Sequence, residues 1–247
     1  MTAPVTGPMT APGPPLLRLA SYNIRKAVGL DWRRRPERIL AVLDEIAPDV
    51  AVLQEADKRL GPRPAALPFP LIAQHGRFMP LDPGPGPSLG WHGNAILLGP
   101  GFGGRVEARL DLPGLEPRGA LIARVEGPPG AFLLVATHLG LDRASRRRQV
   151  AAILDRAGPQ GLPVVIAGDL NEPRPSSLVA KGRRFRVVTP GPSFHAARPV
   201  IAFDHMLLGH GARAVDRGVH VSPLSRVASD HLPIWAEIRL APRPPRE

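Results

Sequence analysis

The stretch VVIAGDLN at residues 164–171 shows the pattern around which the whole chain is organised. It opens with four apolar residues, three of them β-branched, which predicts a short buried strand. An acid and an amide, Asp169 and Asn171, follow where the apolar run stops. They are two residues apart, so in an extended segment both side chains lie on the same side. The stretch therefore predicts a strand that carries two polar side chains to one edge of a sheet.

The same arrangement recurs along the chain. Further apolar runs predict strands at 16–24, 50–54, 94–98, 120–125, 132–137, 203–208, 219–221 and 232–238. Polar residues stand at or beside the ends of several of them, namely Asn23, Glu55, His138, Asp204, Asp230 and His231. Any one of these is by itself an ordinary turn residue, because Asp and Asn favour turns. Together they can meet in one cleft, because strand ends gather along one edge of a sheet.

Two segments have helical periodicity instead. Residues 36–47 begin with a proline suited to the first helical position, place apolar residues along one face and stop before Pro48. Residues 144–157 direct Val150, Ile153 and Leu154 inward and end at a Gly-Pro pair. Many strands with few, separated helices predict a layered α/β sandwich rather than a doubly wound sheet.

Length and composition limit the classes of protein. The 247 residues include no cysteine, so thiolate metal ligands and cysteine nucleophiles are excluded. No apolar run approaches the roughly 18 residues that a membrane span requires. We expect residues 1–15 to be a flexible leader, 16–241 to form one domain and 242–247 to be a tail. We further expect a cytoplasmic monomer with no stable protein partner.

The charge balance leaves two explanations open. Lys and Arg number 32 against 21 Asp and Glu, a net charge of +11, which favours a polyanionic partner such as nucleic acid or an anionic lipid surface. Only three of the 32 are lysines, so a codon bias toward arginine explains the excess equally well. Aromatic residues are 4% of the chain, which is poor provision for base stacking. A nucleic-acid partner would therefore be bound through its backbone.

The remaining polar residues suit one kind of chemistry. The chain has no Walker lysine motif, no His-Glu-x-x-His and no Gly-x-Ser-x-Gly. Carboxylates, amides and imidazoles without thiols are the groups that bind a hard divalent cation together with a phosphate oxyanion.

Six short motifs carry a family resemblance. In chain order they are SYNI at 21–24, LQE at 53–55, GNAIL at 93–97, THL at 137–139, GDLN at 168–171 and SDHLP at 229–233. This set resembles the endonuclease/exonuclease/phosphatase superfamily, also called the DNase-I-like fold, from about Leu17 to Leu240. The resemblance implies a four-layer α/β sandwich of two packed, mostly antiparallel sheets flanked by helices. It also implies hydrolysis of phosphoester bonds with Mg²⁺ or Mn²⁺.

The resemblance also implies roles for individual residues. Glu55 would be the principal metal ligand, with Asn23 and Asp230 nearby. The catalytic set would be Asp169 as the base for the attacking water, Asn171 as a donor to the phosphate, His231 on the phosphate with Asp204 behind it, His138 as a second histidine and Arg118 as a phosphate contact. Asn94, in the GNAIL motif, is expected at the substrate.

Other basic residues and histidines have weaker patterns. Arg33, Arg34 and Arg35 lie in the loop between the first strand and the first helix, so we expect them to clamp a phosphate backbone. The run 146–148 is expected to be a solvated face, because consecutive helical residues point in different directions. Strand alternation directs His205 away from Asp204, as a core or surface histidine, and His195 is expected in solvent.

The substrate stays open between several classes. Positive charge favours a nuclease that cleaves DNA or RNA by metal-assisted attack of water, with nucleic acid as the expected substrate. A hydrolase of phospholipids or small phosphodiesters or phosphomonoesters is the alternative, with an anionic lipid as partner. A catalytically silent nucleic-acid-binding domain is the third interpretation.

Overall fold

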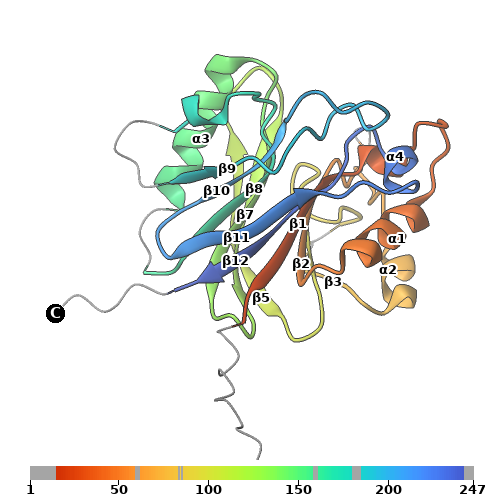
Figure 1. Cartoon of the computed structure of the whole chain (residues 1–247), viewed down its shortest axis with the longest axis horizontal. Coiled ribbons are helices and arrows are strands. Elements are labelled where there is room, and N and C mark those ends of the chain that lie inside the picture. Colours follow the sequence, from red (N-terminus) through yellow and green to blue (C-terminus); the bar gives the residue numbers. More distant parts are fainter. Residues whose placement is uncertain are drawn as a thin grey trace, which may run out of the picture.

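The computed structural model describes residues 15–58, 62–82, 84, 86–157, 161–179 and 185–241. Nearly all of the expected leader and the whole of the expected tail lie outside the described residues, so these two expectations stay predictions. The described residues form two six-stranded sheets packed face to face with helices on the outer faces (Figure 1). This is the four-layer sandwich that the resemblance implies.

The first sheet has the strand order β11-β12-β1-β2-β4-β3. Its strands are β1 (Leu17–Asn23), β2 (Val50–Gln54), β3 (Met79–Pro80), β4 (Ala95–Leu98), β11 (Ala212–Val219) and β12 (Ile234–Leu240). The second sheet has the order β5-β6-β7-β8-β10-β9. Its strands are β5 (Gly103–Leu112), β6 (Arg118–Glu126), β7 (Phe132–His138), β8 (Val164–Asp169), β9 (Arg186–Val188) and β10 (Asp204–Leu208).

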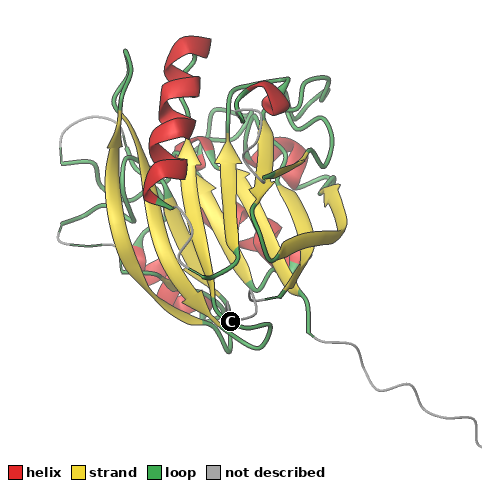
Figure 2. Cartoon of the chain, turned by 90° about the vertical axis from the view of Figure 1, so that its left-hand side faces the viewer, coloured by secondary structure: helices red, strands yellow, loops and turns green. Residues whose placement is uncertain are grey.

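The helices cover the two outer faces. α1 (Pro36–Ile46), α2 (Phe69–His75) and α4 (Ser225–Ala228) contribute to the core on the first sheet, and α3 (Arg143–Arg156) packs on the second (Figure 2). Two 3₁₀ turns span Arg25–Ala27 and Pro175–Ser177. The expected helices agree with α1 and α3 to within one residue at each end. Asp142 caps α3 by accepting a hydrogen bond from the Ser145 amide at 2.7 Å.

Three apolar clusters hold the four layers together. Leu19 and Val52 of the first sheet meet Leu134 of the second in the central core. The other two clusters lie between each sheet and its helices, with Leu43 of α1 in one and Ile153 of α3 in the other. Alternate residues of each strand therefore enter different layers, as strand geometry requires.

The topology brings the predicted strand ends to one edge. Each sheet has one parallel pair, β1–β2 and β7–β8, and its other pairs are antiparallel. The parallel strands end together, so Asn23 lies beside Gln54, and His138 lies beside Asp169. The antiparallel strand β10 begins at this same edge, and its register pairs Asp204 with Asp169. Asp169 is therefore flanked by His138 on one side and Asp204 on the other.

Several elements differ from the sequence-based expectation. The strand expected at 219–221 is β11, which ends at Val219, and β3, β5, β9, α2 and α4 were not expected. β5 alternates apolar with charged residues, and a β-bulge between Val106 and Ala108 shifts its register. Val106 consequently contacts the central core, whereas Ala108 and Leu110 contact the core under α3. Its half-exposed position explains why it has no continuous apolar run.

Candidate active site

Asp169 lies at the centre of the gathered residues. Its side chain is buried, and its Oδ2 accepts a hydrogen bond from Asn23 Nδ2 at 3.0 Å. The same oxygen lies 3.3 Å from His138 Nε2 and 3.7 Å from His231 Nε2. Its Oδ1 accepts from the backbone amide of Asn171 at 3.0 Å. One carboxylate thus joins groups from β1, β7, β8 and the segment that precedes β12.

Asn171 is fixed by an unusual backbone conformation. Its φ of 50° places it in the left-handed region, where a non-glycine residue is strained and often functional. Its Nδ2 donates to the Leu139 carbonyl at 2.9 Å and lies 3.1 Å from His138 Nε2. His138 Nε2 thus faces both an amide donor and the Asp169 carboxylate, so it can accept from one or donate to the other. This arrangement suits a histidine that changes its protonation state.

The two imidazoles have opposite electrostatic environments. Burial lowers the pKa of His138 to about 4, against the opposing effect of the Asp169 charge. Burial also opposes the charged form of His231. Its pKa is nevertheless raised to about 10 by the charge and hydrogen bond of Asp204, and further by the charges of Asp169 and Asp230. At neutral pH His138 is therefore neutral and His231 is protonated, a separation typical of acid–base sites.

Asp204 holds His231 in place. Its Oδ2 accepts from His231 Nδ1 at 2.8 Å and from Ser193 Oγ at 2.5 Å. The Asp204 side chain is buried, so this charged pair is shielded from solvent. His231 therefore directs Nε2 toward Asp169, and Ser193 is a further partner of Asp204 that the sequence motifs did not reveal.

The three predicted metal ligands lie around one turn. Glu55, directly after β2, has a φ of 52° and forms an ion pair with Lys26 Nζ. Asp230 lies 3.4 Å from Arg25 Nε, and Asn23 Oδ1 accepts from the Arg25 amide at 3.1 Å. Arg25 and Lys26 have φ angles of 46° and 57°, and this left-handed turn is what brings both cations to the acids.

The oxygen donors fit a hard divalent cation. Glu55, Asn23 and Asp230 offer carboxylate and amide oxygens, which Mg²⁺ prefers, and it keeps several of its waters. Each of the two carboxylates also forms an ion pair with a cationic side chain of the turn. Within the described residues, Asp169, Asp204 and His231 form a second group that can hold a metal ion, with ligand atoms within 4.8 Å of one another. Its imidazole is bonded to Asp204 through Nδ1 and is protonated at neutral pH, and a protonated imidazole is a poor ligand.

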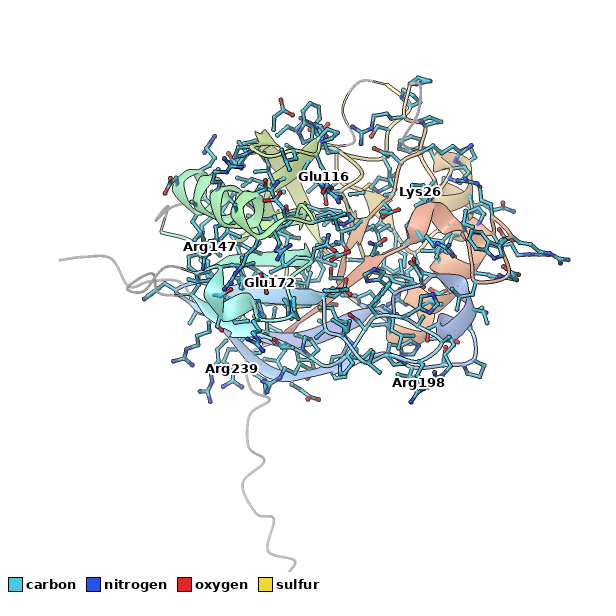
Figure 3. All side chains as sticks on the ribbon, turned by 90° about the horizontal axis from the view of Figure 1, so that it is seen from above. Lys26, Glu116, Arg147, Glu172, Arg198 and Arg239 are labelled. Atoms are coloured by element: carbon cyan, nitrogen blue, oxygen red, sulfur yellow. The ribbon has the colours of Figure 1, made fainter. Side chains whose placement is uncertain are left out.

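Arg118 stands at the start of β6, close enough to His138 that its charge contributes to that histidine's lowered pKa. Its guanidinium is buried and donates to Glu116 Oε2 from Nε at 3.0 Å and from Nη2 at 2.6 Å. Glu116 Oε1 also accepts from the Leu141 amide at 3.0 Å. Glu116, which the motifs did not reveal, therefore ties the arginine to the loop after β7. Seen from above, Lys26, Glu116 and Glu172 lie around the middle of this end of the molecule (Figure 3).

Asn94 is buried beside the cleft rather than open to it. Its Nδ2 donates to the carbonyls of Trp91 and Gly119 at 3.1 and 3.0 Å. These bonds attach the turn at 91–94 to β6 next to Arg118. The structure thus shows a positioning role for Asn94, and direct contact with substrate stays a prediction.

The arginine runs divide into exposed and buried residues. Arg33, Arg34 and Arg35 are exposed, and Arg34 Nη1 donates to the Lys26 carbonyl at 2.8 Å, so the run adjoins the turn that carries Arg25 and Lys26. Arg146 corrects the expectation of a solvated face. It is buried and donates to Glu172 Oε2 at 2.9 Å and to the Leu141 carbonyl. One residue of a helical run of three faces inward, and here it joins the loop after β7 to the loop after β8.

The remaining histidines agree with their expected surroundings. His205 is a buried core residue whose Nε2 lies 2.9 Å from the Glu172 carbonyl, and burial lowers its pKa. His195 is exposed and packs its ring against Phe194.

A two-sheet sandwich with this acid, amide and imidazole centre defines a class of phosphoester hydrolases. The model of the Endonuclease/Exonuclease/phosphatase family matches residues 20–231. The chain belongs to this family, and it is a metal-dependent phosphoric ester hydrolase.

Solved structures share the fold. A protein described as an endonuclease/exonuclease/phosphatase from Beutenbergia cavernae is 26% identical, with a TM-score of 0.68, covering 92% of this chain and 72% of that one. TDP2 of D. rerio, complexed with a single-strand DNA product, is 17% identical over 90% of this chain and 98% of its own, with a TM-score of 0.69. The human Nocturnin catalytic domain with a bound sulfate anion is 19% identical over 92% and 95%, with a TM-score of 0.66. No curated protein sequence matches the chain.

Proposed function

We propose that the chain is a nuclease that hydrolyses phosphodiester bonds of DNA or RNA with Mg²⁺ or Mn²⁺. The observation that carries the proposal is the position of Asp169, whose carboxylate meets two amides and two imidazoles of opposite protonation state. Such a centre has a base for water and a charged donor for phosphate within one cleft.

In this proposal the metal is held by Glu55, Asn23 and Asp230. When bound, the cation supplies polarisation of the phosphate and stabilises charge on the leaving oxygen. Lys26 and Arg25 hold these carboxylates in position when the cation is released. These ion pairs are the contacts that a divalent cation would replace.

The chain's own groups would divide the remaining work. Asp169, oriented by Asn23 and by the Asn171 amide, takes a proton from the attacking water. His231, charged and fixed by Asp204, donates from Nε2 to a phosphate oxygen. Arg118, His138 and Asn171 add donors around the same phosphate, and donors fixed in advance stabilise the charge that develops in the transition state.

Nucleic acid is the substrate that the charge of the chain favours. The net charge of +11 and the exposed arginines at 33–35 suit a polyanion that extends beyond one phosphate. The related TDP2 structure holds a single-strand DNA product, which supports this choice. Action as a monomer in the cytoplasm belongs to the same proposal. Among the described residues no helix is both long and apolar enough to span a bilayer.

A specific observation favours one competing substrate. Large apolar side chains are exposed on loops next to catalytic residues: Trp32 at 79%, Leu115 at 86%, Leu141 at 67% and Val200 at 68%. Exposed apolar residues around a cleft with basic neighbours also suit an anionic phospholipid surface. A phospholipid or small phosphodiester hydrolase is therefore the second candidate.

A substrate panel tests the proposal. Plasmid DNA, single-stranded DNA, RNA, phosphatidylglycerol vesicles and bis-nitrophenyl phosphate are each incubated with Mg²⁺, with Mn²⁺ and with EDTA. We expect cleavage of nucleic acid that requires the metal and is lost in Glu55→Gln, whereas the exposed control Glu126→Gln keeps it. Cleavage of vesicle lipid without cleavage of nucleic acid would replace the proposal by the second candidate.

A further inference from the structure

A basic pocket lies at the end of the sandwich opposite the candidate active site. It has a volume of about 380 Å³ and is lined by residues of β9, β10, β11 and β12 together with the turn at 209–211. Its basic members are Arg186, His210, Arg213 and Arg239, and none of the described residues that line it is acidic. A volume of this size is in the range of small-ligand sites.

The pocket is separate from the catalytic centre. β10 begins with Asp204 at that centre and ends with Leu208, which lines the pocket. At a rise of about 3.3 Å per residue, the strand separates the two sites by roughly 13 Å. β12 likewise starts just after His231 and ends beside Ala241 in the pocket lining. In the view from above, Arg239 lies at the margin, away from Lys26 and Glu116 (Figure 3).

The basic side chains in this pocket have no partners. Within the described ranges, the side chains of Arg186, His210, Arg213 and Arg239 form no hydrogen bond and no ion pair. Some arginines elsewhere in the fold are paired with a carboxylate, such as Arg18 with Glu237 at 2.9 Å and Arg38 with Asp31 at 2.8 Å. All four residues are exposed and line the same hollow, so their donors are accessible to a ligand.

The strand register places two of these charges face to face. Arg213 and Arg239 are directly opposite in the β11–β12 pair, where side chains start about 5 Å apart. Like charges in this position destabilise a sheet. An anion between the two guanidinium groups would remove that repulsion. Arg186 lies on the edge strand β9 of the other sheet, opposite Leu208, and lines the same pocket.

We propose that this pocket binds a phosphate group through Arg186, Arg213 and Arg239. Arginine suits this ligand because its planar fork donates two parallel hydrogen bonds to phosphate oxygens. The phosphate belongs either to free inorganic phosphate or to a nucleic-acid backbone, and the chemistry of recognition is the same. The inference concerns a site outside the catalytic cleft and does not depend on the proposed nuclease activity.

The test compares two variants of the full chain. The double variant Arg213→Gln/Arg239→Gln removes the opposed pair, and the control Arg147→Gln/Arg156→Gln removes the same charge from exposed positions on α3. NMR signals of the arginine Nε–H groups are followed during titration with inorganic phosphate, at constant ionic strength maintained with chloride. A second titration uses a single-stranded DNA oligonucleotide. Arg118 reports separately on binding in the catalytic cleft.

We expect the Arg186, Arg213 and Arg239 signals of the wild-type protein to shift in at least one titration. The affinity at this site should fall by about tenfold or more in the double variant and stay unchanged in the control. The titration in which the double variant loses affinity identifies the source of the phosphate. Without any anion, the double variant should unfold at the same temperature as the wild type or higher, because a repulsion is removed. The proposal would be overturned if the wild type, the double variant and the control bound inorganic phosphate equally well and also bound the oligonucleotide equally well. It would also be overturned if chloride shifted the same arginine signals to the same extent.

Discussion

Replacing Asp204 by asparagine tests how the site controls His231. The substitution keeps the size of the side chain but removes the charge that lies 2.8 Å from His231 Nδ1. A hydrogen bond to a charged group contributes about 1.5–3 kcal/mol, and each 1.4 kcal/mol is a factor of ten, so kcat/KM should fall about 10- to 150-fold. Burial of the imidazole persists, so the pKa of His231 should fall from its value of about 10 toward or below its ordinary value of 6.5.

The loss should depend on pH in a defined direction. The wild-type imidazole stays charged up to a pH near its raised pKa, whereas the variant imidazole loses its proton at lower pH. The deficit in rate should therefore widen as the pH rises from about 6 to about 9. Steady-state hydrolysis of bis-nitrophenyl phosphate gives the rates, and NMR titration of the His231 ring gives the pKa without reference to activity.

A matched control separates this effect from a general loss of charge. Asp216→Asn removes an exposed carboxylate on β11 and should leave both the rate and the His231 pKa unchanged. An Asp204→Asn enzyme with a wild-type pH profile and a kcat/KM within about threefold of the wild type would refute the reasoning, because it would show that the buried charge does not act through His231.

Three other changes probe different parts of the structure. Glu116→Gln weakens the paired contacts that hold Arg118 and should lower kcat/KM about tenfold with little change in melting temperature; unchanged kinetics would show that Arg118 needs no support. Glu172→Gln leaves the buried Arg146 without its carboxylate and should cost about 3–5 kcal/mol in urea unfolding. Burial opposes the charged form of Glu172, but the hydrogen bond from Arg146 lowers its pKa. The contribution of Glu172 to stability is therefore complete above pH 4.5 and is lost as the pH falls through the lowered pKa. In the variant the free energy of unfolding should fall less steeply at acid pH, and an equally steep fall would contradict the pairing. Replacing all three arginines at 33–35 by serine should weaken nucleic-acid binding and flatten its salt dependence by up to about three phosphate equivalents, measured by fluorescence anisotropy; an unchanged slope would make the run a solvated loop.

The gathering of polar strand ends at one edge could be predicted because topology determines it. Parallel pairs end at the same edge of a sheet, so polar residues after apolar runs had to lie near one another once β1–β2 and β7–β8 paired. The pattern therefore indicated Asn23, Glu55, His138 and Asp169 from local signals alone. The family motifs added roles that the pattern could not assign.

The supporting residues could not be predicted in the same way. Lys26 reaches Glu55 only because of its left-handed turn, and no apolar periodicity marks that conformation. Ser193 and Glu116 lie in loops, whose contacts depend on packing between distant segments. The solvated face expected for 146–148 was wrong for Arg146, because residues that point in different directions on a helix include one that faces inward, where Glu172 accepts its hydrogen bond.

The edge strand β5 shows a signal that was present in the sequence. Residues 105–111 alternate charged and apolar side chains, which is typical of a half-exposed strand. A search for continuous apolar runs passes over this segment. The bulge between Val106 and Ala108 could not be foreseen, because it depends on pairing with β6.

The most direct test of the account is single-turnover cleavage of a labelled oligonucleotide by Asp169→Asn in Mg²⁺. The account predicts that the variant binds the oligonucleotide with wild-type affinity but cleaves it about 10²–10⁴-fold more slowly, because this carboxylate acts on the attacking water. Cleavage at the wild-type rate, or lost binding with unchanged turnover of the bound strand, would contradict the assignment of Asp169 as the centre of a metal-dependent nuclease site.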